Sequence, residues 1–213
     1  MDTAVKAAET LIGIEAVTLA PENPFTWSSG LKSPIYCDNR LLLSHPEERR
    51  FIYKAMADKI KNSGADVIAG TATAGIPHAA WIAEELNLPM IYVRSSNKGH
   101  GKQNKIEGKL KEGSAVVIIE DLISTGGSAF QAAEAVEAAG ANVIAVHAIF
   151  TYELAAAEKA IASKSYPVTA LTTFGTLAEA ASDKGYITKE SLESLRAWQQ
   201  DPESWSKEAA HQK

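Results

Sequence analysis

Thirteen consecutive residues near the middle of the chain combine the groups needed to hold a phosphorylated sugar. An apolar run, residues 116–119, is followed by the acidic pair Glu120-Asp121 and then by residues 124–128, which read Ser-Thr-Gly-Gly-Ser. The carboxylates can accept hydrogen bonds from vicinal hydroxyls or help to hold a hydrated divalent cation. The glycines allow close approach to the main chain, whose free N–H groups at a helix start suit a phosphate dianion.

Each of these residues, taken alone, also has a simpler interpretation. Glu120 and Asp121 could end a strand, and Ser124 could cap a helix. The complete order favours a site for a sugar phosphate, with the diol at one end and the phosphate at the other. It differs from a nucleoside-triphosphate loop, which needs Gly-x-x-x-x-Gly-Lys-Ser/Thr, and from the Gly-x-Gly-x-x-Gly dinucleotide motif.

Short apolar runs that alternate with helical segments place this motif in a parallel sheet. The expected strands are residues 67–70, 90–93, 115–119, 143–149 and 168–172. The expected intervening helices are residues 77–86, 127–139 and 154–162. Continuous β-branched runs between helices are typical of an α/β fold whose sheet is covered on both faces. Ligands on such sheets bind beyond the carboxyl ends of the strands.

The flanking segments have other patterns. Residues 3–15 form an amphipathic helix by periodicity, and the Pro/Ser/Gly-rich residues 21–34 cannot form a regular helix. Residues 95–112 carry five lysines and three glycines with few apolar side chains. A loop of this length inside a compact domain is usually functional.

Composition limits the classes of function. The 213 residues are 46% hydrophobic and 22% charged, with a net charge of −5, which argues against a broad positive field for nucleic acid. Cys37 is the single cysteine, so no internal disulfide can form and a reducing compartment is favoured. The first residues do not resemble a signal peptide, and no apolar run of about 18 residues could span a bilayer. We expect a cytoplasmic protein with no nucleic-acid or membrane partner.

Residues 116–128 resemble the signature for phosphoribosyl pyrophosphate (PRPP) in type I phosphoribosyltransferases. The wider chain is similar to the orotate phosphoribosyltransferase family, in its Gram-positive bacterial form. Residues 29–36 (Ser-Gly-Leu-Lys-Ser-Pro-Ile-Tyr), 70–77 and 94–108 resemble that family's N-terminal segment, pyrophosphate loop and mobile catalytic loop.

The resemblance implies a fold and a domain organisation. It predicts the type I phosphoribosyltransferase fold, a Rossmann-like parallel sheet of about five strands flanked by helices, with a small hood. A single domain would span residues 1–213, with an N-terminal helix and hood (1–45), the parallel core (64–175) and C-terminal helices (176–213).

The resemblance also implies a reaction. Ribose 5-phosphate would pass from PRPP to N1 of orotate with inversion at the anomeric carbon, giving orotidine 5-phosphate and pyrophosphate in de novo pyrimidine (UMP) biosynthesis. Mg²⁺ would be needed, held mainly through PRPP and water near Glu120 and Asp121, with no strong direct protein ligand. The enzyme would be a homodimer whose catalytic loop closes over the neighbouring subunit's site.

Site residues carry over position by position. The catalytic residues would be Lys98, His100 and Asp121. Residues that would bind PRPP are Arg94, Lys98, His100, Glu120, Asp121, Leu122, Ile123, Ser124, Thr125, Gly126, Gly127 and Ser128. The pyrophosphate loop would be Thr71, Ala72, Thr73, Ala74 and Gly75. Orotate would contact Ser124, Lys32 and Tyr36.

This sequence departs from the family pattern at three places. Some members carry lysines where this chain has Ala74 and, in our alignment, Ser28, so the main-chain amides of residues 71–75 must carry more of the pyrophosphate binding. Some also use an arginine for the orotate carboxylate, and none lies near Tyr152, which leaves Lys32 as the candidate. Two alternatives stay open: the same fold acting on another base, and a regulator that keeps the PRPP site as a sensor.

Overall fold

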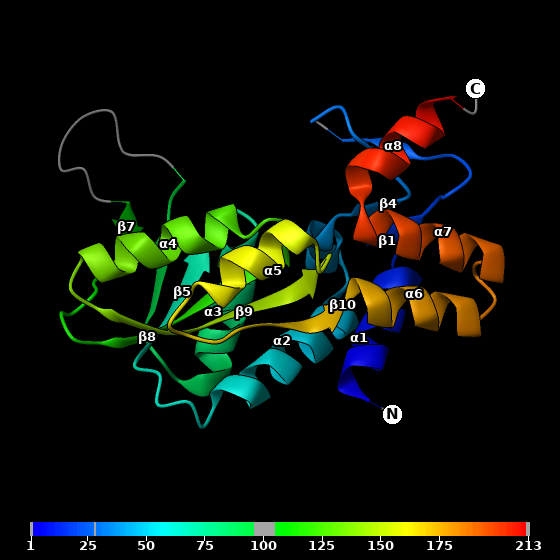
Figure 1. Ribbon diagram of the computed structural model, residues 1–213. Coiled ribbons are helices and arrows are strands. Elements are labelled where there is room, and N and C mark those ends of the chain that lie inside the picture. The colour runs from blue at the N-terminus through cyan, green and yellow to red at the C-terminus, as the bar shows by residue number, and fades with distance from the viewer. Residues whose placement is uncertain (1, 28, 96–104, 212–213) are drawn as a thin grey trace.

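The computed structural model describes residues 2–27, 29–95 and 105–211. Its centre is a six-stranded sheet in the order β10-β9-β8-β5-β6-β7 (Figure 1). The strands are β5 (Val67–Thr71), β6 (Met90–Val93), β7 (Ile106–Glu107), β8 (Ala115–Ile123), β9 (Asn142–Thr151) and β10 (Val168–Thr173). Neighbours are parallel except β6 and β7. The α/β fold expected from the sequence is confirmed, with one short antiparallel edge strand in addition.

Helices cover both faces of this sheet (Figure 1). One face carries α4 (Gly127–Ala138) and α5 (Ala155–Ala162), and the other carries α2 (Pro46–Ile60) and α3 (Gly75–Leu86). Alternate residues of β8 serve the two layers, since Val116 and Ile118 lie in the core under α4 whereas Val117 and Ile119 lie in the core under α2 and α3. Burial on both faces explains why the strands read as continuous apolar runs.

Both ends of the chain build a second layer beside β10. The N-terminal part comprises α1 (Thr3–Gly13), the antiparallel pair β1 (Val17–Leu19) and β4 (Ile35–Cys37), the antiparallel pair β2 (Phe25–Thr26) and β3 (Lys32–Ser33), and the 3-10 helix η1 (Asn39–Ser44). The C-terminal part comprises α6 (Phe174–Asp183), α7 (Lys189–Gln200) and α8 (Pro202–His211).

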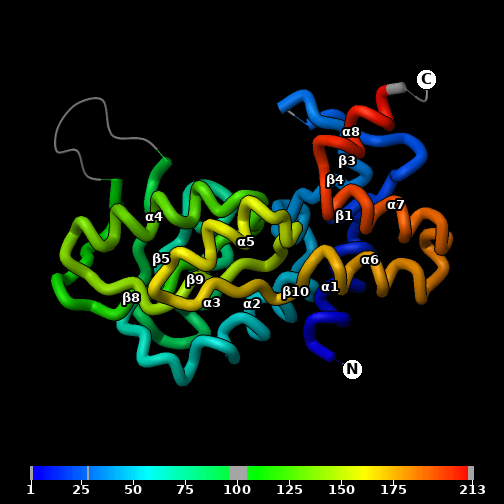
Figure 2. Tube along the Cα trace, in the orientation of Figure 1, coloured from blue at the N-terminus to red at the C-terminus, as the bar shows by residue number. Residues whose placement is uncertain are grey.

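The hood therefore has a C-terminal component. Figure 2 shows α8, at the red end of the tube, beside β3. The main-chain N–H of Lys32 in β3 donates to the Ser206 hydroxyl of α8 at 2.8 Å. The sequence assigned the hood to the N-terminal segment, and the structure adds this helix to it. None of the helices in the described ranges is long and apolar enough to cross a bilayer.

The central strand β8 is longer than its apolar run. It pairs with β5 only as far as Gly70 opposite Ile119, but it continues along β9 to Ile123 opposite Thr151. The acidic pair therefore lies within the strand, where the sequence placed it just beyond the end. Pairing with β9 overrides the low strand propensity of Glu and Asp.

Candidate active site

The acidic pair and the start of α4 form one continuous unit at the end of β8. Glu120 is 4% exposed, and its carboxylate accepts hydrogen bonds from the Ser128 hydroxyl (2.6 Å) and the Asp121 N–H (3.0 Å). Gly126 precedes α4 with φ +85°, and a Cβ there would lie 2.3 Å from the Phe130 ring. Only glycine fits this turn, which leaves the first N–H groups of α4 available to an anion.

Asp121 is a carboxylic acid in an unusual environment. Burial, together with the hydrogen bond and the charge of Glu120, raises the pKa of Asp121 to about 7. A group with this pKa changes its charge near neutral pH, as is common in active sites. This environment places a carboxyl group whose charge varies near neutral pH beside the start of α4.

The loop that follows β5 lies against the same stretch of β8. The Thr71 hydroxyl donates to the carbonyl oxygen of Ile119 at 3.1 Å. A Cβ on Gly75 would lie 2.5 Å from that oxygen and 2.5 Å from the Thr71 hydroxyl oxygen. The Ala72 N–H donates to the Val93 carbonyl at 2.8 Å. Residues 71–75 thus lie against Ile119, directly before the acidic pair, at the carboxyl edge of the sheet; their binding of pyrophosphate stays a prediction.

Of the cationic residues expected to contact pyrophosphate, the structure describes Arg94. Arg94 follows β6, and its guanidinium lies 3.5 Å from the Glu107 carboxylate. Lys98 and His100, and also Ser28, lie outside the described residues. Their predicted roles therefore stay predictions.

A cavity of about 790 Å³ lies between the hood and the end of β8. It is called the base cavity below, because residues expected to contact orotate line it. Tyr36 from β4 and Ser124 from the PRPP motif, both expected to contact orotate, line it together with Leu122 and Thr125. Lys32 does not line the cavity, but its ammonium donates to the hydroxyl of Thr26, which does (2.8 Å). Two of the three residues predicted to contact orotate thus line one cavity, and Lys32 lies beside it.

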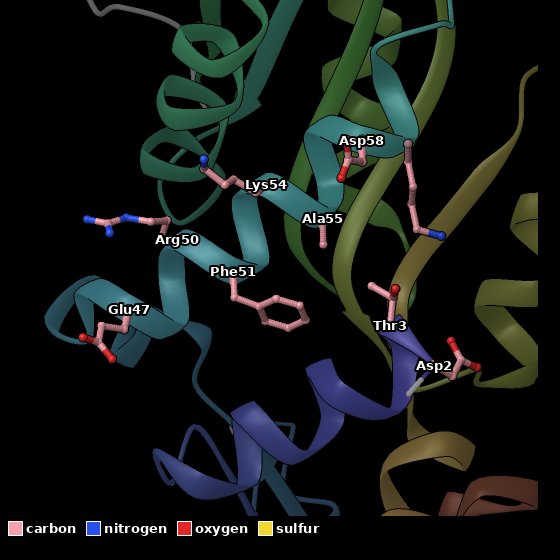
Figure 3. Close-up of a pocket in the computed structure, with 9 residues that line it drawn as sticks. Asp2, Thr3, Glu47, Arg50, Phe51, Lys54, Ala55 and Asp58 are labelled. Atoms are coloured by element: carbon pink, nitrogen blue, oxygen red, sulfur yellow. The ribbon is translucent and has the colours of Figure 1, made fainter.

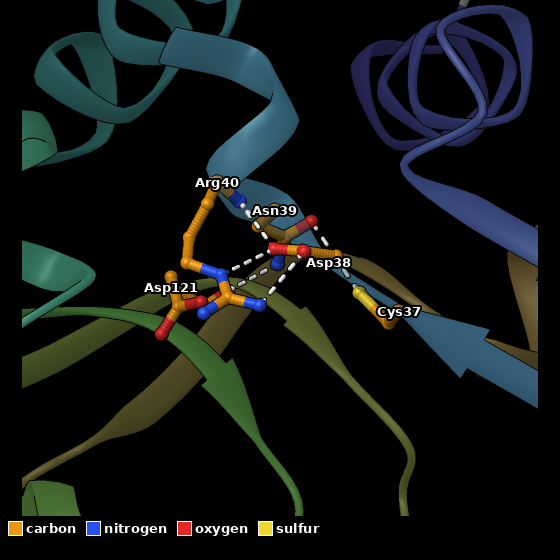
Figure 4. Close-up of polar contacts among 5 residues, drawn as sticks. All are labelled: Cys37, Asp38, Asn39, Arg40 and Asp121. Atoms are coloured by element: carbon orange, nitrogen blue, oxygen red, sulfur yellow. Dashed lines mark hydrogen bonds and ion pairs between the residues drawn. The ribbon is translucent and has the colours of Figure 1, made fainter.

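The sequence missed two sets of residues at this site. Pro202 and Glu203 of α8 line the base cavity, although they lie far along the chain from the motif. The other set follows β4: the Asn39 amide donates to the main-chain carbonyl of Asp121, and the Arg40 side chain extends toward Asp121 (Figure 4). The polar run Asp-Asn-Arg after an extended segment was the only visible signal for the second set.

A second cavity, of about 800 Å³, lies between α1 and α2 (Figure 3). It contains no residue of the PRPP motif, the pyrophosphate loop or the base cavity. Its charged side chains are all exposed: Asp2, Glu47, Arg50, Lys54, Asp58 and Lys59. Solvated charges of both signs give it no specific binding chemistry.

The carboxylates near the start of α4 are the candidate metal-binding groups of the site. Within the described ranges, no group of three or more His, Cys, Asp or Glu side chains could hold a metal ion. Glu120 and Asp121 are the carboxylates at the sugar-phosphate end of the site. This donor set fits a cation that takes most of its ligands from a bound polyphosphate and water.

A parallel sheet with an acidic pair, a helix start and a second loop at one edge is the architecture of a phosphoribosyltransferase. The phosphoribosyl transferase domain family matches residues 41–178. The orotate phosphoribosyltransferase of Listeria monocytogenes (serotype 4b) is 53% identical over 204 residues, which cover 95% of this chain and 98% of that protein.

Solved structures agree with this class. Leishmania donovani UMP synthase has a TM-score of 0.78 and 30% identity, over 92% of this chain and 42% of that one. The orotate phosphoribosyltransferase of Aeropyrum pernix has a TM-score of 0.72 and 26% identity, over 85% of this chain and 99% of that one. The chain belongs to the orotate phosphoribosyltransferase family, as its sequence predicted.

Proposed function

We propose that this protein transfers ribose 5-phosphate from PRPP to N1 of orotate, giving orotidine 5-phosphate and pyrophosphate in pyrimidine biosynthesis. One observation carries the proposal. The base cavity is lined by Leu122, Ser124 and Thr125 of the PRPP motif. In the same motif, Glu120 and Ser128 bond to each other at the end assigned to the sugar phosphate. A single segment thus reaches both places that a base and a ribose phosphate must occupy for the new bond to form.

The proposed reaction divides the work among these groups. Glu120 and Asp121 hold the ribose hydroxyls, and the main-chain amides of residues 125–128 hold the 5-phosphate. N1 of orotate gives up its proton to the departing pyrophosphate and attacks the anomeric carbon as the bond from that carbon to the pyrophosphate oxygen breaks, so the ring passes through an oxocarbenium-like state. Arg94 and the main-chain amides of residues 73–75 then stabilise the charge that grows on the leaving oxygens.

Lys98 and His100 are assigned to the same leaving group. Cations directed at the pyrophosphate oxygens favour its departure, and a closed loop excludes the water that would hydrolyse PRPP. We assign no direct protein ligand to Mg²⁺, which would bind through PRPP and water near Glu120 and Asp121. When bound, the ion neutralises pyrophosphate charge.

The base is assigned to the cavity beneath the hood. Tyr36 and Ser124 would contact the orotate ring, and Lys32, beside Thr26, would pair with its carboxylate. This chain has Ser28 and Ala74 where some family members have lysines. We therefore assign Lys32, beside this cavity, as the cation that the hood supplies. Uracil, which lacks the carboxylate, would not benefit from it.

The assay that tests the activity follows the loss of orotate absorbance with PRPP and Mg²⁺. We expect turnover with orotate and at least tenfold lower kcat/KM with uracil or purine bases, since a charge-assisted contact contributes about 1.5–3 kcal/mol. Lys32→Ala should raise the KM for orotate and leave the KM for PRPP unchanged. No turnover with any base, but intact PRPP binding and a positive gel shift with nucleic acid, would favour the sensor instead.

We propose a homodimer in which each catalytic loop serves the neighbouring subunit. Two inactive variants, Lys98→Ala in the loop and Asp121→Asn in the core, should then regain activity when their subunits are exchanged. Random exchange gives about a quarter of wild-type activity, because half of the dimers are mixed and each holds one intact site. A mixture that stays inactive after exchange, checked by differently tagged subunits, would show that each site is built from one chain.

A cytoplasmic location is part of the proposal. It rests on the reducing environment that a single cysteine favours. Cell fractionation that placed the protein outside the cytoplasm would refute it.

A further inference from the structure

The two substrate ends of the site are joined by one buried side chain, Asn39. It is the first residue of η1, two residues after the end of β4, and it is 1% exposed. Its amide nitrogen donates to the main-chain carbonyl oxygen of Asp121 at 2.7 Å (Figure 4). Its amide oxygen accepts from the thiol of Cys37, which lines the base cavity, at 3.4 Å.

The bond to Asp121 lies where the sheet gives β8 less support. Pairing with β5 stops at Ile119, so the segment that carries the acidic pair runs on beside β9 without β5. Two side chains then bond the carbonyls of residues two positions apart in β8, Thr71 that of Ile119 and Asn39 that of Asp121. A buried carbonyl needs such a partner, because leaving it unpaired costs about 1–3 kcal/mol.

We propose that Asn39 is a positioning residue for PRPP. By holding the main chain of Asp121, it sets the place of the carboxylate assigned to the ribose hydroxyls, and through Cys37 it fixes that place relative to the base cavity. The inference rests on the proposed function for the identity of the ligand. It assigns Asn39 no contact with either substrate.

The neighbouring ion pair supports this reading of the segment. Arg40 donates to both carboxylate oxygens of Asp38, at 2.6 and 2.8 Å. The Arg40 N–H also donates to the Asp38 carboxylate (3.1 Å) in the turn that follows β4, and the Arg40 side chain extends toward Asp121 (Figure 4). Residues 38–40 thus hold the chain on both sides of the bond from Asn39.

The test is a double-mutant cycle on the affinity for PRPP with Mg²⁺, measured by calorimetry without orotate. Asn39→Ala should weaken PRPP binding about tenfold in the wild-type background, which corresponds to the loss of one buried hydrogen bond. In an Asp121→Asn background the same substitution should change the affinity less than about twofold, because the carboxylate it positions is gone. Equal weakening in both backgrounds, or none in either, would overturn the proposal.

Two further variants separate positioning from stability. Asn142→Ala removes an amide bonded to a main-chain carbonyl, that of Gly113 (3.1 Å), at an exposed position at the start of β9, and should leave PRPP affinity unchanged. Asn39→Asp keeps the side-chain volume and serves if the alanine variant does not fold. It places an oxygen against the Asp121 carbonyl and should weaken PRPP binding at least as much.

The outcomes also distinguish this inference from the proposed function. If the wild-type protein binds PRPP but does not use orotate, the assigned base is wrong, and the double-mutant cycle on PRPP affinity can still be interpreted. Wild-type protein that does not bind PRPP would refute both.

Discussion

Asp121→Asn is expected to lower kcat by about 10²–10³-fold, the usual effect of removing a charge-stabilising group from a transition state. The asparagine has the same size, so it can keep the main-chain bond with Asn39. It cannot supply the negative charge that an oxocarbenium-like ribose ring attracts. Steady-state kinetics should therefore show a loss in kcat together with a higher KM for PRPP, because the same carboxylate is assigned to the ribose hydroxyls.

The same substitution, which lowers activity, should raise the stability of the protein relative to wild type as the pH rises. The pKa of Asp121 is raised to about 7 in the folded protein, against about 3.9 in an unfolded chain. The unfolded state therefore releases this proton more readily, and the stability that the protonated carboxyl contributes is lost as the pH rises through 7. The asparagine does not titrate, so the variant should gain stability relative to wild type between pH 5 and pH 8.

Denaturant unfolding at the two pH values measures this shift. Asp183→Asn, at an exposed position at the end of α6, serves as the control and should show no comparable change. Wild-type kcat/KM for PRPP should also fall below pH 7, with an apparent pKa that belongs to the Glu120–Asp121 pair. Wild-type turnover in Asp121→Asn, or stability differences that do not vary with pH, would show that the carboxylate does not have the assigned role.

Local sequence order was sufficient to predict that an acidic pair and a helix start lie together at one edge of the sheet. The acidic pair, the turn at Gly126 and the start of α4 are contiguous, and the apolar run of β8 aims them at the sheet edge. The parallel core was predictable for a similar reason, because burial on both faces leaves continuous apolar runs. β7 was not, since only Ile106 of its two residues is apolar.

The base end was harder to predict, because it depends on packing between distant segments. Asn39 and Asp121 are 82 residues apart, and Lys32 and Ser206 are 174 apart. No periodicity in either segment indicates these bonds. The amphipathic character of α8 indicates that it packs, but not that Pro202 and Glu203 become a wall of the base cavity.

Gly75→Ala is the second substitution with a large expected effect. The added Cβ would lie 2.5 Å from the carbonyl oxygen of Ile119 and 2.5 Å from the hydroxyl oxygen of Thr71. Because neither contact is with the end of a flexible side chain, the pyrophosphate loop itself must move. We expect a stability loss of about 1–3 kcal/mol, typical of overpacking. A loop displaced by about 1 Å should also lower kcat/KM for PRPP about 10²-fold.

Gly13→Ala is the matched control, because nothing lies within 4 Å of a Cβ added at the end of α1. It should keep wild-type kinetics and leave stability unchanged or raise it by up to about 1 kcal/mol. The comparison separates two roles of the contact between Gly75 and β8. If Gly75→Ala unfolds more easily but turns over normally at low temperature, the contact only stabilises the fold. If PRPP kinetics fall while the protein remains folded, the close approach of the loop to Ile119 is needed to hold pyrophosphate beside the acidic pair.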